Sequence, residues 1–411
     1  MRATLARKRD WVGAAWTIRL GKIPSTPMAP FAHLDHSDYA LAPELQSQLL
    51  SPSLVVFIDQ VRANIRRVIE CAGGDSDRWR VHLKTTKIPA IWDELLNAGV
   101  RHFKCATVRE TAELLTLLDE REISGDVLLA YPLVGPGLDY LGRLAVAHGS
   151  QRVSVLCEDE ERIGSIPAAL EIFIDLNSGM DRTGVPVADR ETILACARAA
   201  QGRLRGLHHY DGHLHAADMD LRRQEIFEGY DRLVALVGDL NAQGIEVDEV
   251  ITAGTPAFLS ALEYTPLRKL QGARHRVSPG TVVFHDARSQ VENPGLGLAP
   301  AALVFSRVVS QPRRGQITLD AGSKALAAEA GDPAAHALGH PEWTALSPSE
   351  EHLPVDLGGG PAPERGSACL LIPRHVCPTV NLAEEALLVE SDGSHSVVRV
   401  SARAHDLFAP G

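Results

Sequence analysis

The chain has 411 residues, a formal net charge of −11, 45% hydrophobic residues and 23% charged residues. This composition is ordinary for a soluble globular protein, and the length allows one large domain plus a smaller second one. The negative charge, with no long Lys/Arg stripe, argues against a nucleic-acid partner, and the lack of a long apolar run argues against a membrane span. Six scattered cysteines do not suggest a disulfide framework, so we expect a reducing, cytoplasmic location.

Residues 1–50 are interpreted as an N-terminal extension. The first thirty residues are rich in Arg and Lys around a short apolar patch, Val12–Trp16. The patch is short and lacks a clear cleavage site, which argues against a targeting peptide. We therefore expect an extension that is disordered or only loosely docked.

From about Ser51, runs typical of strands alternate with runs of helical apolar spacing. After a leading strand at 54–58 and a helix, eight further strands are predicted at 81–85, 102–106, 127–130, 153–156, 171–175, 206–210, 249–252 and 275–284. Amphipathic stretches such as 88–98, 109–118 and 224–240 lie between them. The pattern is that of eight β/α units.

Two folds produce this alternation, the doubly wound sheet and the closed (β/α)8 barrel. No G-x-G-x-x-G sequence follows the strand at 81–85, which favours the barrel. We assign residues 51–292 to a (β/α)8 TIM-like barrel and 293–411 to a β-rich C-terminal domain. That domain has short predicted strands separated by Gly/Pro-rich turns, and the leading strand at 54–58 could pack with it.

Lys84 lies in the stretch His82-Leu83-Lys84-Thr85-Thr86-Lys87, at the end of the first barrel strand. A lysine inside a strand is unfavourable unless its amine has a task, because burying an ammonium costs several kcal/mol. An imine with pyridoxal 5′-phosphate (PLP) would remove that charge. The alternative is a lysine whose amine extends past the strand end into water.

Polar residues also end the fifth, sixth and seventh barrel strands. Arg182 follows the fifth strand in a Gly-containing turn, where a fixed cation could face a phenolate or a carboxylate. Tyr210-Asp211-Gly212-His213 ends the sixth strand, and such a cluster of titratable groups favours a polar site. Thr252-Ala253-Gly254-Thr255 ends the seventh, where backbone amides and two hydroxyls would suit a phosphate. Each motif alone also fits a surface loop.

In the C-terminal domain, His375 and Cys377 are two residues apart. On an extended segment, residues i and i+2 point to the same side, so both side chains could bind one ion. A Cys/His pair suits Zn²⁺ and leaves open positions for substrate or water. A buried structural histidine beside an unrelated cysteine is the alternative.

Taken in order, these motifs resemble the D-threonine aldolase and D-serine dehydratase family, a branch of the alanine-racemase-like (fold type III) PLP enzymes. The resemblance runs from about Pro52 to Glu390. It includes 54–59, 82–87, 175–184, 210–213, 253–256, 278–280 with Phe284 and Asp286, 320–326, 350–352 and 373–382. No single motif is decisive, but the ordered set is specific.

The resemblance implies a PLP-bearing barrel, a β-rich second domain and commonly a homodimer. Lys84 matches the imine lysine and Arg182 the arginine that faces the cofactor's phenolic oxygen. The candidate catalytic residues are Lys84 and His213, and the candidate cofactor-binding residues are Lys84, Arg182, Tyr210, Thr252, Gly254 and Thr255. His375 and Cys377 match the metal pair, with Zn²⁺ favoured over Mn²⁺ or Mg²⁺.

Two positions depart from the family. Thr86 stands where the family usually has histidine, so an imidazole that could help in proton transfer is absent. Cys377 stands where D-threonine aldolases typically have aspartate, as in D-serine dehydratases. The sequence therefore favours dehydration of a β-hydroxy-D-amino acid to a keto acid and ammonia. Retro-aldol cleavage to glycine and an aldehyde is the alternative, and a non-catalytic PLP carrier, which needs no metal, is a third.

Overall fold

The computed structural model describes Phe31 and residues 34–409. The expectation of a disordered extension therefore lies outside the described residues for 1–30 and 32–33. For residues 34–50 it is wrong, because η1 (His36–Tyr39) and α1 (Pro43–Gln48) form there. Tyr39 and Leu41 are buried in one apolar cluster with strands of the second domain, and this burial orders the segment.

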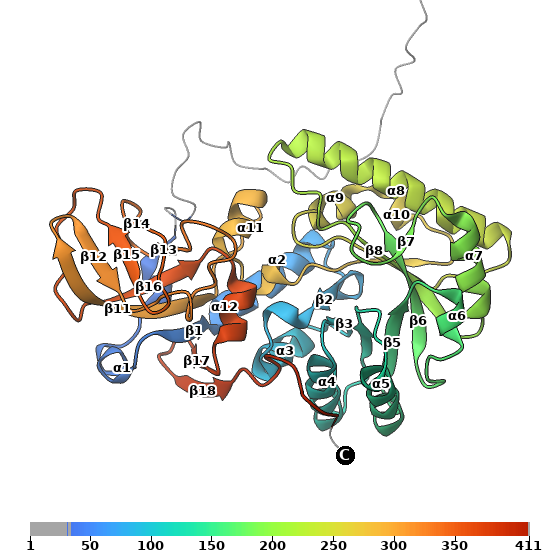
Figure 1. Ribbon diagram of the computed structural model, residues 1–411, viewed down its shortest axis with the longest axis horizontal. Coiled ribbons are helices and arrows are strands. Elements are labelled where there is room, and N and C mark those ends of the chain that lie inside the picture. Colours follow the sequence, from blue (N-terminus) through green and yellow to red (C-terminus); the bar gives the residue numbers. More distant parts are fainter. Residues whose placement is uncertain (1–30, 32–33, 410–411) are drawn as a thin grey trace, which may run out of the picture.

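The predicted alternation of strands and helices forms a nearly closed, eight-stranded parallel barrel (Figure 1). Its strands are β2 (Arg80–His82), β3 (His102–Cys105), β4 (Asp126–Leu129), β5 (Arg152–Cys157), β6 (Glu171–Asn177), β8 (Leu204–Tyr210), β9 (Glu249–Thr252) and β10 (Arg274–Val277). The short β7 (Val185–Pro186) pairs with β6 outside this order. The predicted fold class is confirmed, but the eighth strand ends at Val277 rather than Phe284. Residues beyond it form η4 (Thr281–Val283).

The barrel closes at a seam between β10 and β2. A single parallel bridge joins Trp79 to Val277, and the Trp79 indole nitrogen donates a hydrogen bond to the Pro279 carbonyl (2.9 Å). A Cβ atom on Gly280 would lie 2.3 Å from the His82 carbonyl oxygen. Glycine is therefore required where these two chain segments meet.

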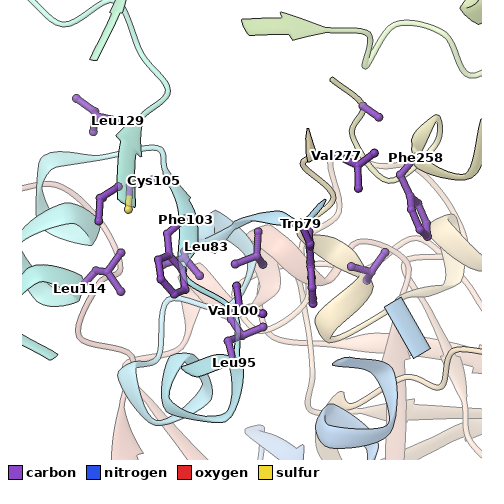
Figure 2. Close-up of a cluster of buried hydrophobic side chains, with 14 of the residues drawn as sticks. Trp79, Leu83, Leu95, Val100, Phe103, Cys105, Leu114, Leu129, Phe258 and Val277 are labelled. Atoms are coloured by element: carbon purple, nitrogen blue, oxygen red, sulfur yellow. The ribbon is translucent and has the colours of Figure 1, made fainter. Parts of the chain in front are cut away.

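Helices surround the barrel and bury its outer face. They are α2 (Ile58–Cys71), α3 (Pro89–Asn97), α4 (Val108–Glu120), α5 (Pro136–Ala147), α6 (Glu160–Ile163), α7 (Arg190–Ala199), α8 (Met219–Ala242), α9 (Phe258–Glu263) and α10 (Thr265–Arg268). Between helices and strands lies one large apolar core, part of which Figure 2 shows around Trp79, Phe103 and Phe258. No helix among the described residues is long and apolar enough to span a membrane.

The barrel interior has an apolar middle and two polar ends. Leu128, Leu156, Phe173 and Ile251, from four strands, form a small separate cluster. Because inward positions recur every second residue, the same strands carry Asp126 and Glu249 on one side of this cluster and Asp175 on the other. The polar layer at the carboxyl ends of the strands is the floor of the candidate site.

The second domain is built on a β-sheet and has its own apolar core, separate from that of the barrel (Figure 1). Its strands are β11 (Ala302–Arg313), β12 (Gln316–Leu319), β13 (Ala335–Ala337), β14 (Thr344–Ala345), β15 (Leu353–Asp356), β16 (Ala368–Pro373), β17 (Glu385–Val389) and β18 (His395–Arg399). The leading strand β1 (Ser53–Phe57) pairs antiparallel with β11 and parallel with β17. It therefore belongs to this sheet, and α11 (Ala287–Glu292) and α12 (Val376–Leu382) lie between the sheet and the barrel.

Candidate active site

Lys84 does not lie inside a strand, contrary to the sequence interpretation. β2 ends at His82, and Leu83–Thr85 form the 3-10 turn η3 at the mouth of the barrel. Leu83 and Thr85 are buried whereas Lys84 is half-buried, so the turn is anchored on both sides of Lys84 and leaves Lys84 partly exposed. A partly exposed lysine at the carboxyl end of a barrel strand is placed where barrel enzymes have their chemistry.

Thr86, which replaces the family histidine, is fully buried. The indole nitrogen of Trp92 donates a hydrogen bond to its hydroxyl (2.8 Å), and that hydroxyl donates to the Leu83 carbonyl (3.2 Å). Thr86 therefore supports the turn that presents Lys84.

The loops after β9 and β10 meet at a compact turn that fits a phosphate. Gly254 lies under the ring of Tyr210, where a Cβ atom would be 3.0 Å from Cε2. The Ser278 amide donates to the Thr252 carbonyl (2.9 Å), and Thr255 is buried beside them. The hydroxyl of Ser278 is buried and has no hydrogen-bond partner among the described residues. A buried hydroxyl without a partner is costly unless a bound group satisfies it.

The Asp211 side chain restrains this turn. The Gly254 amide donates to the Asp211 carboxylate (3.3 Å), which also accepts from the Tyr230 hydroxyl (2.5 Å). Thr252 points away from the turn, since its hydroxyl lies 2.8 Å from the His275 imidazole. Of the three residues predicted to hold the phosphate, Thr252 thus already has a side-chain partner.

Arg182 and Tyr210, both candidate cofactor-binding residues, lie together at the barrel mouth. The Arg182 guanidinium is 5.2 Å from the centroid of the Tyr210 ring, within the range of a cation–π contact. His213 packs on the loop after β6, because a Cβ on Gly179 would lie 3.3 Å from its Nε2. The Nδ1 atom of His213 is buried without a hydrogen-bond partner among the described residues.

His375 and Cys377 are not on an extended segment, so the argument from strand spacing is wrong. His375 is the N-cap of α12 and Cys377 lies in its first turn. The two side chains nevertheless interact: burial opposes the charge of His375, but the Cys377 thiol and the Glu329 carboxylate raise its pKa to about 9. His375 Nδ1 lies 2.6 Å from Glu329 Oε1, so Nε2 is the ring nitrogen that could act as a ligand.

The Cys377 side chain of this pair also contacts the barrel. The sulfur of Cys377 lies 3.1 Å from the Thr85 hydroxyl and 3.5 Å from the Thr281 hydroxyl. Burial raises the pKa of this thiol, but the His375 imidazole outweighs burial and holds the pKa below its usual value. A thiolate and an imidazole next to the Lys84 turn are a donor set that fits Zn²⁺.

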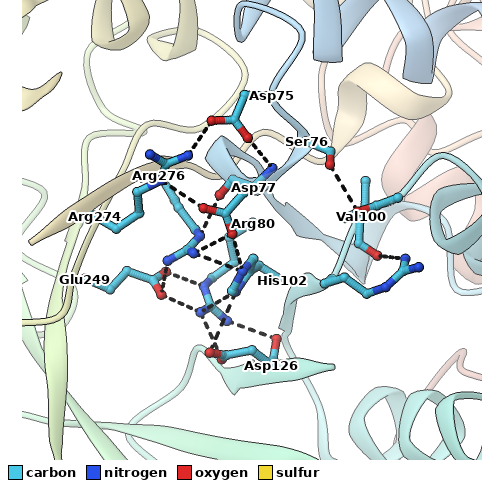
Figure 3. A network of polar contacts seen from close by, with 12 residues as sticks. Asp75, Ser76, Asp77, Arg80, Val100, His102, Asp126, Glu249, Arg274 and Arg276 are labelled. Atoms are coloured by element: carbon cyan, nitrogen blue, oxygen red, sulfur yellow. Dashed lines mark hydrogen bonds and ion pairs between the residues drawn. The ribbon is translucent and has the colours of Figure 1, made fainter. Parts of the chain in front are cut away.

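A second cluster of possible metal ligands, His102, Asp126 and Glu249, lies at the opposite end of the barrel (Figure 3). There the buried Arg80 bonds both Glu249 (2.6 Å) and Asp126 (2.9 Å). Arg276 adds a second bond to Glu249 (2.7 Å). Guanidinium groups already neutralise these carboxylates, so the cluster is a structural ion network.

The sequence interpretation missed Lys104, a buried lysine in the polar layer beneath the mouth. Its Nζ lies 3.3 Å from His208 Nε2, and His208 Nδ1 lies 2.7 Å from Asp175 Oδ1. Lys104 is two residues after His102 in a predicted strand, so it too is a lysine within a strand. The test applied to Lys84 would have found it.

Comparisons with known proteins agree with this architecture. Residues 56–287 match the family described as "Alanine racemase, N-terminal domain", and residues 301–389 match "Putative serine dehydratase domain". A D-threonine aldolase of Arthrobacter sp is 26% identical in an alignment 398 residues long, which covers 92% of this chain and 96% of that protein. A 3-hydroxy-D-aspartate aldolase of Paracoccus denitrificans (strain Pd 1222) is 25% identical in an alignment 370 residues long, which covers 87% of this chain and 93% of that protein.

Among solved structures, the D-threonine aldolase from Filomicrobium marinum superposes with a TM-score of 0.75 at 25% identity. The match covers 86% of this chain and 95% of the aldolase. Because the first family match spans more than half of the sequence, the protein belongs to the alanine-racemase-like family, in the group of D-threonine aldolases and D-serine dehydratases.

Proposed function

We propose that this protein is a PLP- and metal-dependent lyase that acts on a β-hydroxy-D-amino acid. Membership of the family supports the lyase class and the cofactor. The observation that carries the proposal is the 3.1 Å contact between Cys377 and Thr85, because it brings the thiolate–imidazole pair beside the Lys84 turn. A metal held there would be close to a substrate bound at Lys84.

The fit of PLP rests on three features of the chain. Lys84 is partly exposed at the strand end, the hydroxyl of Ser278 needs a partner, and Gly254 leaves room that a side chain would fill. Lys84 would hold the cofactor covalently, while Gly254, Thr255 and Ser278 would bind its phosphate. When bound, PLP supplies an electron sink for charge that develops at the substrate's Cα.

The remaining tasks fall to side chains at the mouth. Arg182 would provide a permanent cation near the phenolic oxygen of the cofactor, with Tyr210 holding it in place through the ring contact. The Lys84 amine would accept the proton at Cα. His213 is a second candidate for proton transfer, because Nδ1 has no hydrogen-bond partner among the described residues. His375 and Cys377 would hold Zn²⁺, which supplies Lewis acidity toward the β-hydroxyl oxygen.

Dehydration to a keto acid and ammonia is the first candidate reaction. It is favoured by Cys377, which stands where the resembling D-serine dehydratases have cysteine and D-threonine aldolases have aspartate. Retro-aldol cleavage to glycine and an aldehyde is the second candidate. It is favoured by the curated sequence relatives, which are named as aldolases at 25–26% identity.

One experiment tests the proposal and separates the two reactions. The holoenzyme with Zn²⁺ is given D-serine, D-threonine and D-3-hydroxyaspartate, and products are identified as keto acid or as glycine plus aldehyde. In parallel, borohydride reduction and peptide mapping should place the pyridoxyl group on Lys84, and Lys84→Ala should abolish both trapping and turnover. Trapping on Lys87 or Lys104 instead, or no product from any of these substrates, would refute the proposal.

The resemblance also implies a homodimer, which we include in the proposal. Analytical ultracentrifugation of the holoenzyme at micromolar concentration should give twice the mass of the 44.3 kDa chain. A single species of monomer mass across that range would contradict it.

A further inference from the structure

Lys104 is a buried lysine that the mechanism above does not use. It projects from β3 into the barrel and is 2% exposed. Its backbone carbonyl lies 3.0 Å from His82 Nδ1, and its Nζ lies 5.5 Å from the centroid of the Tyr210 ring. Lys104 is thus in the layer directly beneath the turn that carries Lys84.

The amine of Lys104 ends a hydrogen-bonded chain of three buried residues. Burial and the charge of Lys104 lower the pKa of His208, so its ring is neutral. The Asp175 carboxylate lies 2.7 Å from His208 Nδ1, and despite its burial this contact holds its pKa below the usual value. His208 therefore donates from Nδ1 to Asp175 and accepts at Nε2 from Lys104. The chain fixes the amine of Lys104 through one N–H group. The lone pair of the neutral amine remains available for an additional proton.

Opposing influences set the pKa of Lys104. Burial, and next the like charge of Lys84, lower its pKa to about 7, while Asp175 and Asp211 act in the opposite direction. The charged and titratable groups around it are Lys84 on η3, Arg80 and His82 on β2, Asp175 on β6, His208 and Tyr210 on β8, and Asp211 after β8.

Binding of PLP would shift the protonation equilibrium of Lys104 toward the charged form. The covalent bond to Lys84 uses up the free ammonium that opposes a proton on Lys104. The phosphate adds a charge of about −1.5 to −2 at pH 7. Both changes favour the protonated form of Lys104.

We propose that Lys104, held by His208 and Asp175, is an acid–base residue of the cofactor site that takes up one proton from solvent when PLP binds. The proton remains on Nζ, so the bound cofactor gains a second cation besides Arg182. This inference rests on the proposed attachment of PLP at Lys84. It predicts that PLP affinity falls as the pH rises above neutrality. Binding consumes a proton, and the proton concentration of the solution is then lower.

The test is calorimetric titration of the apoprotein with PLP at pH 7.5, in buffers of different ionisation enthalpy. The wild type should take up more protons than Lys104→Met, with a difference of at most one proton per site. Lys104→Arg should also lose the uptake, because arginine is charged before PLP arrives, but it should keep the affinity. Lys104→Met should bind PLP on the order of tenfold more weakly.

Lys269→Met, which removes an exposed lysine on the barrel surface, is the matched control and should behave as the wild type. If Lys104 had only a packing role, Lys104→Met and Lys104→Arg would weaken PLP binding equally and would leave the number of protons taken up unchanged. That result would overturn the inference. If Lys104→Met does not fold, the Arg variant decides alone: uptake equal to the wild type overturns the inference. Failure of borohydride to trap PLP on Lys84 in the wild type refutes the proposed function instead.

Discussion

The sulfur of Cys377 lies 3.1 Å from the hydroxyl of Thr85, although 291 residues of chain separate the two positions and they belong to different domains. Because Thr85 follows Lys84 directly, the domain contact positions the metal pair relative to the cofactor lysine. The Asp286 carboxylate fixes the start of α12, since it accepts from the Val376 amide (3.0 Å) and from the Ser289 amide (2.7 Å). The proposed metal and cofactor sites thus use neighbouring but separate residues.

Cys377→Ala should therefore lose Zn²⁺ and turnover while keeping PLP, because the cofactor lysine belongs to the barrel. Metal content is measured after gel filtration, and PLP by its absorbance at about 410–430 nm, the range of lysine-bound PLP. Cys377→Asp should shift the preference toward Mn²⁺ or Mg²⁺, since a carboxylate is a harder ligand. Cys369→Ala, a half-buried cysteine on β16, is the control. Full activity of the native protein after exhaustive chelation would remove the metal from the proposal.

Glu329→Gln should weaken Zn²⁺ binding by about 10- to 100-fold, because its carboxylate accepts from His375 Nδ1 and orients the ring so that Nε2 could act as a ligand. The control is Glu342→Gln, which alters a similar exposed pair, His340 Nδ1 to Glu342 Oε1 at 3.4 Å. Competition with a zinc-binding dye gives both affinities. Equal affinities in the two variants would exclude an orienting role for Glu329.

Ser278→Ala and Thr255→Val should each weaken PLP binding by about 1–3 kcal/mol, the cost of losing a hydrogen bond to a charged group. For Ser278→Ala the apoprotein should lose no stability, because the hydroxyl has no hydrogen-bond partner among the described residues. Thr344→Val, an exposed threonine on β14, is the control. Unchanged PLP affinity in both site variants, measured by fluorescence quenching, would place the phosphate elsewhere.

The barrel could be predicted from the sequence because its strands alternate with amphipathic helices, but the strand ends could not. Leu83, Val282 and Val283 are buried in 3-10 turns, so the apolar pattern runs past the last paired residue of β2 and of β10. The Val- and Thr-rich segment after His375 is typical of a strand, yet Pro378 is tolerated in the first turn of a helix.

The relation between Lys104, His208 and Asp175 depends on strand register, which no local pattern encodes. β3 pairs with β2 so that Lys104 lies opposite His82, and β6 pairs with β8 so that Asp175 lies opposite His208. The individual residues were visible in the sequence, and His208 and Asp175 lay in stretches that were singled out. Their meeting at one level of the barrel follows only from the closed sheet.

Gly280→Ala should destabilise the protein by about 1–3 kcal/mol through overpacking at the barrel seam. The backbone of Gly280 has φ −121° and ψ −42°, so the cost is steric and arises from the 2.3 Å approach of the new Cβ to the His82 carbonyl. Gly238→Ala in α8 is the matched control, since no atom of the described residues other than the nearby backbone of α8 lies within 4 Å of the new Cβ. It should be neutral or slightly stabilising, because alanine favours a helix. Urea unfolding compares the two, and a stable Gly280→Ala would mean that the seam can open locally.

Stability should fall as the pH drops from about 6.5 to 4, in part because of His209. Burial lowers the pKa of His209 to about 4, and its ring packs edge-on against Tyr230 beneath α8. The unfolded chain binds a proton at its ordinary pKa near 6.5, whereas the folded chain does not until about pH 4. The unfolded state therefore holds more protons in this window, so the free energy of unfolding decreases as the pH falls, by up to about 1.4 kcal/mol per pH unit for one group. Above pH 6.5 this contribution to stability is fully present.

His209→Leu should accordingly make the slope of unfolding free energy against pH shallower between pH 4.5 and 6.5, whatever its effect on stability at pH 7. His395→Leu removes an exposed imidazole on β18 and should leave the slope unchanged. His275, whose pKa burial lowers to about 3, adds to the slope in both variants, so part of the dependence should remain. Equal slopes in the wild type and His209→Leu would show that His209 is protonated in the folded protein at these pH values, and that its surroundings open to water before the barrel unfolds.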